Sequence, residues 1–294
     1  MSASAPRLTP SELLYRAFRL SGFCYLLRKA LWRNRAAILY YHDPKPDVME
    51  AHLQYLSKVS KIVALPDLWR SISTMPLAAI TIDDGMIGNL ALKAVFLKHG
   101  VRPMLYLCTG IARAGAGYWW LSLRDRQVKA EDLKLLDNRD RKKILSDLGF
   151  DQSHPAIPRQ AMAEELRSVL DWADLGAHTR FHPILVKCDD AECWEEISLS
   201  RRELIPLLGA ELDQFAYPNG DYSEREVAFV KQAGFASART CDPGWNDAGS
   251  DRFRLKGIYI DDDASIDKFA VQLTGVPALA RRLIARLRGA LLGG

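Results

Sequence analysis

The sequence predicts an α/β fold, and specifically a distorted (β/α) barrel of seven or eight strands. From residue 36 onward, short apolar runs alternate with helical patterns, and buried parallel strands have continuous apolar sequences of this kind. Eight such runs are enough to favour a closed barrel over an open sheet. Several runs end in polar residues, as expected where the chemistry of a barrel gathers at the C-terminal ends of its strands.

The expected elements follow one another in order along the chain. The strands are 36–41, 61–65, 78–82, 103–108, 175–178, 214–217, 236–240 and 254–260. Helical segments are expected between and after them, near 47–58, 87–99, 160–172, 191–208, 223–234 and 264–275. One of these helices opens with Ser223-Glu-Arg-Glu226, which is a capping-box pattern.

Length and charge divide the chain into three segments. Its 294 residues, 48% of them hydrophobic, fit one large domain or two small ones. Residues 1–35 hold seven Arg/Lys against Glu12 alone, residues 276–294 hold four arginines and no acid, and the net charge of +4 leaves 36–275 at −6. We expect a basic N-terminal segment (1–35), a mildly acidic barrel domain (36–275) and a basic C-terminal helix (276–294). A nucleic-acid groove would need basic residues at the site itself, so no nucleic acid is expected as a partner.

Both terminal segments have the pattern of amphipathic helices. In 11–32 and in 276–294, large apolar residues recur at helical spacing and are accompanied by Arg and Lys. Neither segment contains a run of about 18 uncharged apolar residues, so neither is expected to span a membrane. Two interpretations stay open. The helices either lie on an anionic membrane leaflet or pack their apolar stripe against the barrel.

Cysteine usage and the N-terminal segment predict a cytoplasmic protein, or one held peripherally at the inner face of the membrane. The five cysteines are odd in number and irregularly spaced, which favours reduced thiols. Cys188 and Cys193 resemble half of a zinc knuckle, but no second pair accompanies them. The apolar stretch near Gly22 is followed by charges and not by a small-residue cleavage site, unlike a signal peptide.

Two carboxylates stand side by side at the end of an apolar run, in Asp83-Asp84-Gly85. Strand alternation alone would send them to opposite faces, but Gly85 allows the chain to turn and aim both at one pocket. One carboxylate can then bind a metal while its neighbour accepts a proton from the water that the metal activates. Taken alone, the string is a weak signal, since Asp-Asp-Gly is also an ordinary turn.

A second string supplies two imidazoles. His178 and His182 are four residues apart, and Pro183 follows them. We expect one helical turn that presents both rings to the same point. With one carboxylate they provide three protein ligands and leave a position for water, as in a catalytic metal site. Two nitrogens and one oxygen suit zinc, with cobalt, nickel or iron as alternatives. A pair of structural core histidines is the competing interpretation.

Five strings, in this order, carry a family resemblance: TIDDG (81–85), YLCTG (106–110), GAHTRFHPIL (176–185), FAYPNGDYSE (215–224) and AGFASARTCDPGWN (233–246). Over about residues 36–275 the chain resembles the polysaccharide deacetylases, the NodB-homology group or carbohydrate esterase family four. The resemblance implies metal-dependent hydrolysis of an N-acetyl, less often an O-acetyl, group on a sugar. It implies that Asp83 is the general base, that Asp84, His178 and His182 bind the metal, and that the backbone N–H of Tyr217 helps to hold the oxyanion.

The chain departs from this family at the last motif, where a histidine usually protonates the departing amine. Here the final strand leads into Asp261-Asp262-Asp263, and no histidine follows His182. Our candidate for the missing acid is His42, which follows the first strand. Asp83 after its first proton transfer, or an aspartate of the 261–263 run, could serve instead, and His42 could simply be a strand-end residue.

Residues 111–159 break the strand–helix rhythm and are too many for an ordinary connection. We interpret them as an insertion over the strand ends that could act as a lid. The insertion contains Tyr118-Trp119-Trp120. These aromatic side chains could stack on a sugar face, or they could anchor a small core within the insertion.

Together, these patterns predict a metal-dependent N-deacetylase of an acetylated amino sugar, acting in the synthesis of a glycan or glycolipid precursor. The basic amphipathic ends would suit a lipid-linked sugar. Two alternatives stay open: a related amidase or deformylase on the same scaffold, and a pseudoenzyme that binds metal and glycan.

Overall fold

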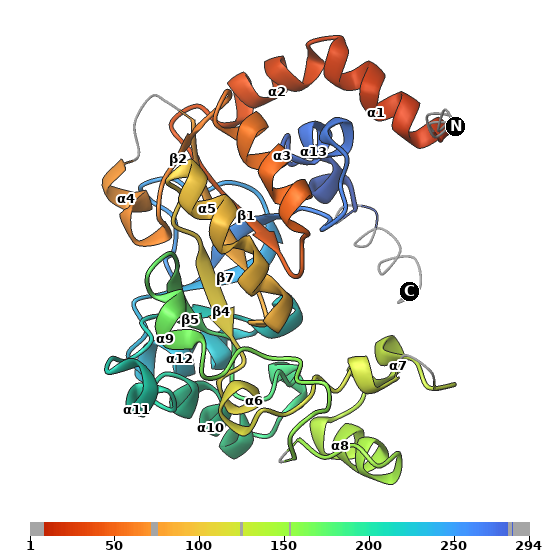
Figure 1. Cartoon of the computed structure of the whole chain (residues 1–294), viewed down its shortest axis with the longest axis vertical. Coiled ribbons are helices and arrows are strands. Elements are labelled where there is room, and N and C mark those ends of the chain that lie inside the picture. The colour runs from red at the N-terminus through yellow and green to blue at the C-terminus, as the bar shows by residue number, and fades with distance from the viewer. Residues whose placement is uncertain (1–8, 72–75, 124–125, 153, 282–283, 285–294) are drawn as a thin grey trace.

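The barrel expected from the sequence is present in the computed structural model, which describes residues 9–71, 76–123, 126–152, 154–281 and 284 (Figure 1). Within these residues the strands are β1 (Ala36–Tyr41), β2 (Lys61–Ile62), β3 (Leu77–Ile82), β4 (Met104–Leu107), β5 (Asp174–Ala177), β6 (Gln214–Ala216), β7 (Ser237–Pro243) and β8 (Leu255–Tyr259). Each coincides with an expected strand. The β2 strand is shorter than expected, and β7 continues three residues further.

Seven of the strands close the barrel. The order is β1-β8-β7-β6-β5-β4-β3, and β3 returns to pair in parallel with β1 along its whole length. The eighth strand, β2, pairs with the start of β3, whereas β4 pairs with the end of β3 at Thr81 and Ile82. Two strands therefore share one edge of β3, which is the distortion in this barrel.

The helices and helical turns follow the strands in sequence. The α-helices are α1 (Pro10–Leu20), α2 (Phe23–Leu31), α3 (Pro46–Leu56), α4 (Leu68–Ser71), α5 (Lys93–His99), α6 (Thr109–Ala114), α7 (Ala130–Lys134), α8 (Asn138–Asp147), α9 (Leu166–Val169), α10 (Asp190–Ser200), α11 (Ile205–Leu208), α12 (Glu224–Gln232) and α13 (Ile266–Gln272). Short 3₁₀ turns are η1 (Leu65–Asp67), η2 (Ile87–Leu92), η3 (Leu121–Leu123), η4 (Leu185–Lys187) and η5 (Pro218–Gly220). The helix expected over 160–172 is reduced to the single turn of α9. None of the described helices is long and apolar enough to cross a membrane.

Alternation along the strands separates two cores. One set of side chains, including Ala37, Leu39 and Tyr41 of β1, packs outward against the surrounding helices. The other set, including Ala36 and Ile38, forms a smaller cluster with residues such as Leu77 and Ala79 of β3. Apolar residues thus fill the start of the barrel.

The N-terminal segment forms two helices, α1 and α2, separated at Gly22, which has a φ of 77°. Helix α1 lies against α13, where Arg19 pairs with Asp267 (Figure 1). No residue of α1 is buried, and its large apolar residues are exposed. The interpretation in which the apolar stripe packs against the barrel is therefore wrong for α1. At the other end of the chain, residues 276–281 and 284 are helical, and the rest of the expected 276–294 helix lies outside the described residues.

The insertion forms its own small unit beside the strand ends, with α7 and α8 projecting from the barrel (Figure 1). Its core contains Trp119, Leu123, Leu133 and Leu145. The buried Arg141 guanidinium lies 4.7 Å from the centre of the Trp119 ring system. The anchoring interpretation of the aromatic residues is therefore correct for Trp119.

Candidate active site

A pocket of about 430 Å³ opens at the C-terminal ends of the barrel strands. Among its lining residues, His42, Asp83 and His178 directly follow a strand, and Tyr259 ends one. The barrel contributes Tyr40, His42, Asp83, Asp84, His178, His182, Asn219, Cys241 and Tyr259, and the insertion contributes Trp119, Trp120, Ala130, Glu131 and Lys134. The pocket thus brings together five of the six candidate site residues, and the insertion forms one of its walls.

The turn after β3 places both carboxylates in this pocket, as the sequence predicted. Asp84 has a φ of 72° and Gly85 a φ of 74°, so the chain leaves the strand through two left-handed residues. A Cβ on Gly85 would lie 2.6 Å from a Leu107 methyl group, so this position also needs the small residue. Asp83 and Asp84 are both buried, 2% and 4% exposed.

The loop after β5 brings the two imidazoles together, but it does so without a helix. Residues 178–184 are irregular, and the expected helical turn is wrong. Thr179 has a φ of 64° and His182 a φ of 53°, and the Thr179 hydroxyl accepts a hydrogen bond from His182 N–H at 3.1 Å. These two left-handed residues fold the loop back so that the imidazole centres are 4.8 Å apart.

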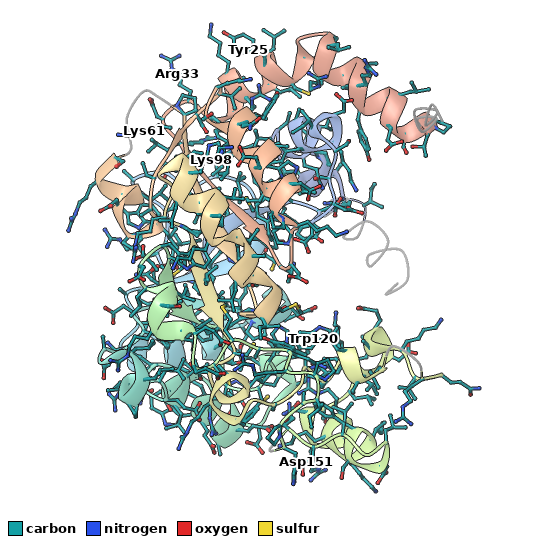
Figure 2. The ribbon with its side chains drawn as sticks, viewed as in Figure 1. Tyr25, Arg33, Lys61, Lys98, Trp120 and Asp151 are labelled. Carbon is teal, nitrogen blue, oxygen red and sulfur yellow. The ribbon has the colours of Figure 1, made fainter. Side chains whose placement is uncertain are left out.

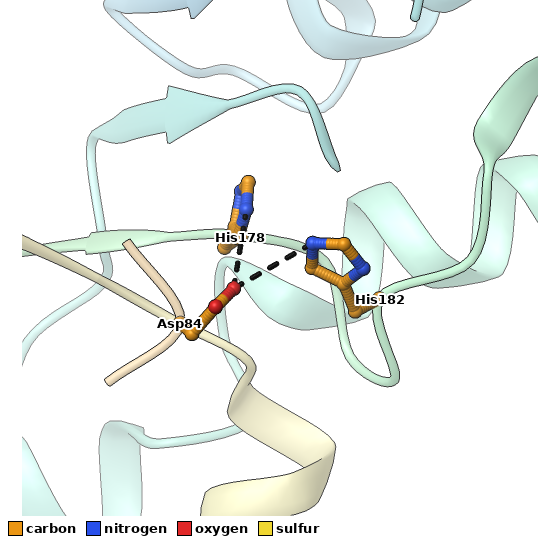
Figure 3. Close-up of side chains that lie close together, drawn as sticks. All are labelled: Asp84, His178 and His182. Carbon is orange, nitrogen blue, oxygen red and sulfur yellow. Dashed lines mark ion pairs between the residues drawn. The ribbon is translucent and has the colours of Figure 1, made fainter. Parts of the chain in front are cut away.

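Asp84, His178 and His182 converge as a metal site would require (Figure 3). The Oδ1 atom of Asp84 lies 3.7 Å from His178 Nε2 and 3.6 Å from His182 Nε2. His178 Nδ1 lies 2.7 Å from the Ala216 carbonyl. Since a carbonyl only accepts, Nδ1 carries the proton and Nε2 presents a lone pair to the carboxylate. Asp84 Oδ1 is buried and has no hydrogen-bond partner among the described residues. A lone pair facing an unpaired carboxylate oxygen fits a cation between them.

Burial sets the protonation of these three groups. It raises the pKa of Asp84 to about 7 and lowers the pKa of His178 to about 4. The pKa of His182 is also well below its ordinary value, because of burial and the neighbouring His178. Both imidazoles are therefore neutral, which is the state that binds a metal. A divalent cation would in turn hold Asp84 in its ionised form.

Asp83, the adjacent carboxylate, has a different partner. Its Oδ2 pairs with Arg239, a fully buried residue of β7. The Arg239 guanidinium lies inside the barrel, 4.5 Å from the centre of the Tyr40 ring and 5.6 Å from that of Tyr106. Burial raises the pKa of Asp83, but Arg239, together with His178 and His42, lowers it further, so its net pKa is below the ordinary value. Asp83 is therefore ionised at neutral pH and has one free oxygen, since Oδ1 has no hydrogen-bond partner among the described residues.

The insertion contacts the metal-ligand candidates directly. The Tyr118 hydroxyl donates to the backbone carbonyl of Asp84 at 2.9 Å, and Trp119 Nε1 donates to that of His182 at 3.2 Å. Trp120 is half-buried, and its ring centre lies 4.5 Å from that of His182. Tyr118 and Trp119 thus position two of the candidate ligand residues, and Trp119 and Trp120 both line the pocket.

A buried glutamate on α10 holds the histidine loop from behind. Glu196 is 7% exposed and accepts hydrogen bonds from Arg180 N–H at 2.8 Å and Phe181 N–H at 2.9 Å. Burial raises its pKa to about 7. Because both bonds fall between the two histidines, Glu196 fixes the loop that sets the distance between them.

Residues 73–238 match the polysaccharide deacetylase family model, which covers more than half of the chain. This chain belongs to the polysaccharide deacetylase family. A comparison with curated proteins found no match. The deacetylase PplD of Streptococcus pyogenes, solved with acetate, has a TM-score of 0.59 at 15% identity over 81% of this chain and 97% of that one. IcaB from Ammonifex degensii has a TM-score of 0.58 at 15% identity over 82% of this chain and 97% of that one. BC0361, a polysaccharide deacetylase from Bacillus cereus, has a TM-score of 0.57 at 18% identity, with 81% and 68% covered. At these identities the three structures support the fold.

The backbone N–H of Tyr217, expected to help hold the oxyanion, is already hydrogen-bonded within the barrel. Its backbone N–H donates to the Arg239 carbonyl at 3.0 Å, and its buried hydroxyl donates to the Phe253 carbonyl at 3.1 Å. That N–H continues the β6–β7 pairing and is not available to an oxyanion. The residue of this motif that lines the pocket is Asn219, which has a φ of 57°.

His42 lies at the pocket as expected, and the aspartate run supports its loop. Asp262 accepts hydrogen bonds from the backbone N–H groups of His42 and Asp43, each at 3.0 Å, and Asn89 donates to the His42 carbonyl at 3.0 Å. Asp262 is thus occupied in holding the loop. The run is not among the residues lining the pocket, so His42 remains the better candidate for the acid.

Sequence reasoning missed Arg239, which lies one residue beyond the part of the chain that matches the family model. The signal was present, because Arg239 is the one charged residue in the run 236–240, whose other residues are small and uncharged. A charge within a barrel strand needs a buried partner of opposite charge, and the two aspartates at the end of another strand, β3, were candidates for it.

Proposed function

We propose that this protein is a metal-dependent N-deacetylase that hydrolyses the acetamido group of an amino sugar. One observation carries the proposal. In a chain of the polysaccharide deacetylase family, a cation-ready cluster (Asp84, His178, His182) and an arginine-paired carboxylate (Asp83) line the same pocket. The first arrangement suits a Lewis acid and the second suits a proton acceptor.

Asp84, His178 and His182 would hold the metal, most suitably zinc, with cobalt, nickel or iron also compatible with these donors. When bound, such an ion lowers the pKa of water towards neutrality and polarises a carbonyl group. Asp83 would accept the proton of the attacking water on its free Oδ1, while Arg239 fixes its other oxygen. His42, on the β1 side of the same pocket, would protonate the departing amine.

The substrate proposed for this site is an acetylated amino sugar of a glycan or glycolipid precursor. The half-buried Trp120 ring supports a sugar substrate, because it lines the pocket beside the metal-ligand candidate His182. In its most specific form, the proposed substrate is a lipid-linked sugar, which the enzyme would deacetylate at the inner face of the membrane.

The direct test is acetate release by the purified full-length protein from N-acetylated amino-sugar oligomers. A strong chelator should abolish the release, and Zn²⁺ or Co²⁺ should restore it. Full activity in stoichiometrically metal-free protein would contradict the metal assignment. Formate release from N-formyl sugars in place of acetate release would instead favour a deformylase. Tight metal and sugar binding without either product would favour a binding pseudoenzyme.

A further inference from the structure

The outer face of α1 and α2 carries a continuous set of exposed apolar side chains. Seven large apolar residues of these two helices are between 40% and 65% exposed: Leu13, Leu14, Phe18, Leu20, Phe23, Tyr25 and Leu26. The rings of Phe18 and Phe23 lie 5.8 Å apart, so the set continues from one helix to the next across the Gly22 turn. Exposed apolar residues clustered in this way indicate a binding surface.

Each of the two helices turns one charged residue inward. In α1, Arg19 faces α13 and pairs with Asp267. In α2, Arg28 is only 6% exposed and donates to the Tyr55 hydroxyl at 3.2 Å. A surface helix of a globular protein usually buries its apolar stripe and exposes its charges. Helix α1 reverses this arrangement. Helix α2 buries Cys24 beside Arg28 but leaves Phe23, Tyr25 and Leu26 exposed, so both helices present apolar side chains to solvent.

Positive charge borders the same face. Residues 10–35 contain six Arg/Lys against Glu12 alone. Lys29, Arg33 and Lys58 line a surface hollow of about 760 Å³ with Tyr25 and Leu26, and no acidic residue lines it. Tyr25 and Arg33 lie at the end of the molecule opposite the insertion, at the top of Figure 2.

We propose that this face of α1 and α2 docks on an anionic membrane surface. Apolar side chains would enter the boundary between headgroups and acyl chains, and the bordering cations would contact lipid phosphates or carboxylates. A second copy of the chain fits less well, because a symmetric contact would bring the two sets of cations together. The inference goes beyond deacetylation, since it concerns a surface built by other residues.

The test is co-sedimentation of the full-length protein with vesicles. On vesicles of phosphatidylcholine and phosphatidylglycerol in roughly equal amounts, the partition coefficient should exceed that on pure phosphatidylcholine by about tenfold or more. High salt should remove most of this difference, because it screens the contact between cations and headgroups.

Two double variants separate the apolar and basic contributions. Leu14→Ser with Leu26→Ser should lower binding to the anionic vesicles by about tenfold or more, because two inserted side chains are lost. Lys29→Ala with Arg33→Ala should lower it by about tenfold and weaken its salt dependence. Leu97→Ser is the matched control, because Leu97 on α5 is 55% exposed against 56% for Leu14. It should bind as the wild type does.

Thermal unfolding of each variant shows whether the fold is retained. The vesicle assay does not depend on hydrolysis of an acetyl group, so it can fail or succeed independently of the proposed function. Equal binding to neutral and anionic vesicles, or unchanged binding of both double variants, would overturn the proposal. So would a solution dimer that the Leu14/Leu26 change dissolves, because a second copy would then be the partner of this face.

Discussion

Two buried histidines, His178 at the strand ends and His52 in α3, differ in the group that their second ring nitrogen faces. Burial lowers the pKa of each to about 4, and each has one ring nitrogen within 2.8 Å of a backbone carbonyl. The other nitrogen of His52 lies 3.2 Å from the Tyr41 hydroxyl, which can donate to it. The other nitrogen of His178 lies 3.7 Å from Asp84 Oδ1, too far for a hydrogen bond, and an ionised carboxylate there can only accept. A buried histidine is therefore a candidate ligand when its second nitrogen meets another acceptor.

Substitution of the two histidines should have opposite consequences. His178→Ala should remove bound metal and reduce acetate release to background, because Asp84 and His182 alone make an incomplete site. His52→Gln should retain both metal and activity. Metal content by elemental analysis, measured beside acetate release, checks both outcomes. Stoichiometric metal in His178→Ala would contradict the comparison.

The adjacent aspartates give the next largest effect. Asp83→Asn retains the shape but cannot accept a proton, so kcat should fall by roughly 10²–10⁴ with metal retained. Asp84→Ala should lose the metal itself. Metal content and kcat are measured on the same preparations. If Asp83→Asn were metal-free and Asp84→Ala fully loaded, the two roles would have to be exchanged.

His52 should also make the fold sensitive to acid. Its pKa is near 4 when folded against an ordinary value of 6.5, so the unfolded chain binds more protons between these values. The stability due to neutral His52 is thus fully present above pH 6.5 and is lost as the pH falls towards 4, by about 3 kcal/mol. Urea unfolding of the wild type and His52→Gln at several pH values checks this. Stability profiles of equal slope over that range would show that His52 is not responsible.

The two hydrogen bonds that Glu196 accepts from the histidine loop should affect metal affinity more than kcat. Glu196→Ala frees the Arg180 and Phe181 N–H groups, so Zn²⁺ affinity should fall by about 10- to 100-fold, as for other groups that orient ligands. Glu196→Gln keeps an oxygen that can accept both bonds and should bind nearly as the wild type does. Glu195→Ala, which removes an exposed partner of Arg180, is the control. Titration against a chelating dye gives the Zn²⁺ affinity of the wild type and of each variant. Equal affinities of Glu196→Ala and wild type would show that Glu196 does not position the metal-ligand candidates.

Sequence patterns predicted the strands and most of the helices, but not the directions in which side chains point. Continuous apolar runs identified every described strand, and the spacing of His178 and His182 identified two candidate ligands that do converge, although the loop joining them is not helical. Arg239 was missed because a strand pattern does not say which buried group a charge will meet. The orientation of α1 was left open for a similar reason, since an amphipathic pattern is the same whichever face packs inward. No sequence pattern predicts the hydrogen bonds from Tyr118 and Trp119 to the backbone carbonyls of Asp84 and His182. They are seen only in the folded structure.

The smallest expected effect concerns His42. If His42 protonates the departing amine, His42→Ala should lower kcat by roughly tenfold without changing metal content, less than general acids usually contribute, because protonated Asp83 can partly replace it. The loss should be smaller for O-acetyl esters, since an alkoxide leaving group needs less help from an acid than an amine does. His99→Ala is the control, because His99 pairs with Glu50 and does not line the pocket. The pH–rate profiles of wild type and His42→Ala decide the matter. An alkaline limb that persists unchanged in the variant would assign the proton to another group, and Asp83 would then act first as base and afterwards as acid.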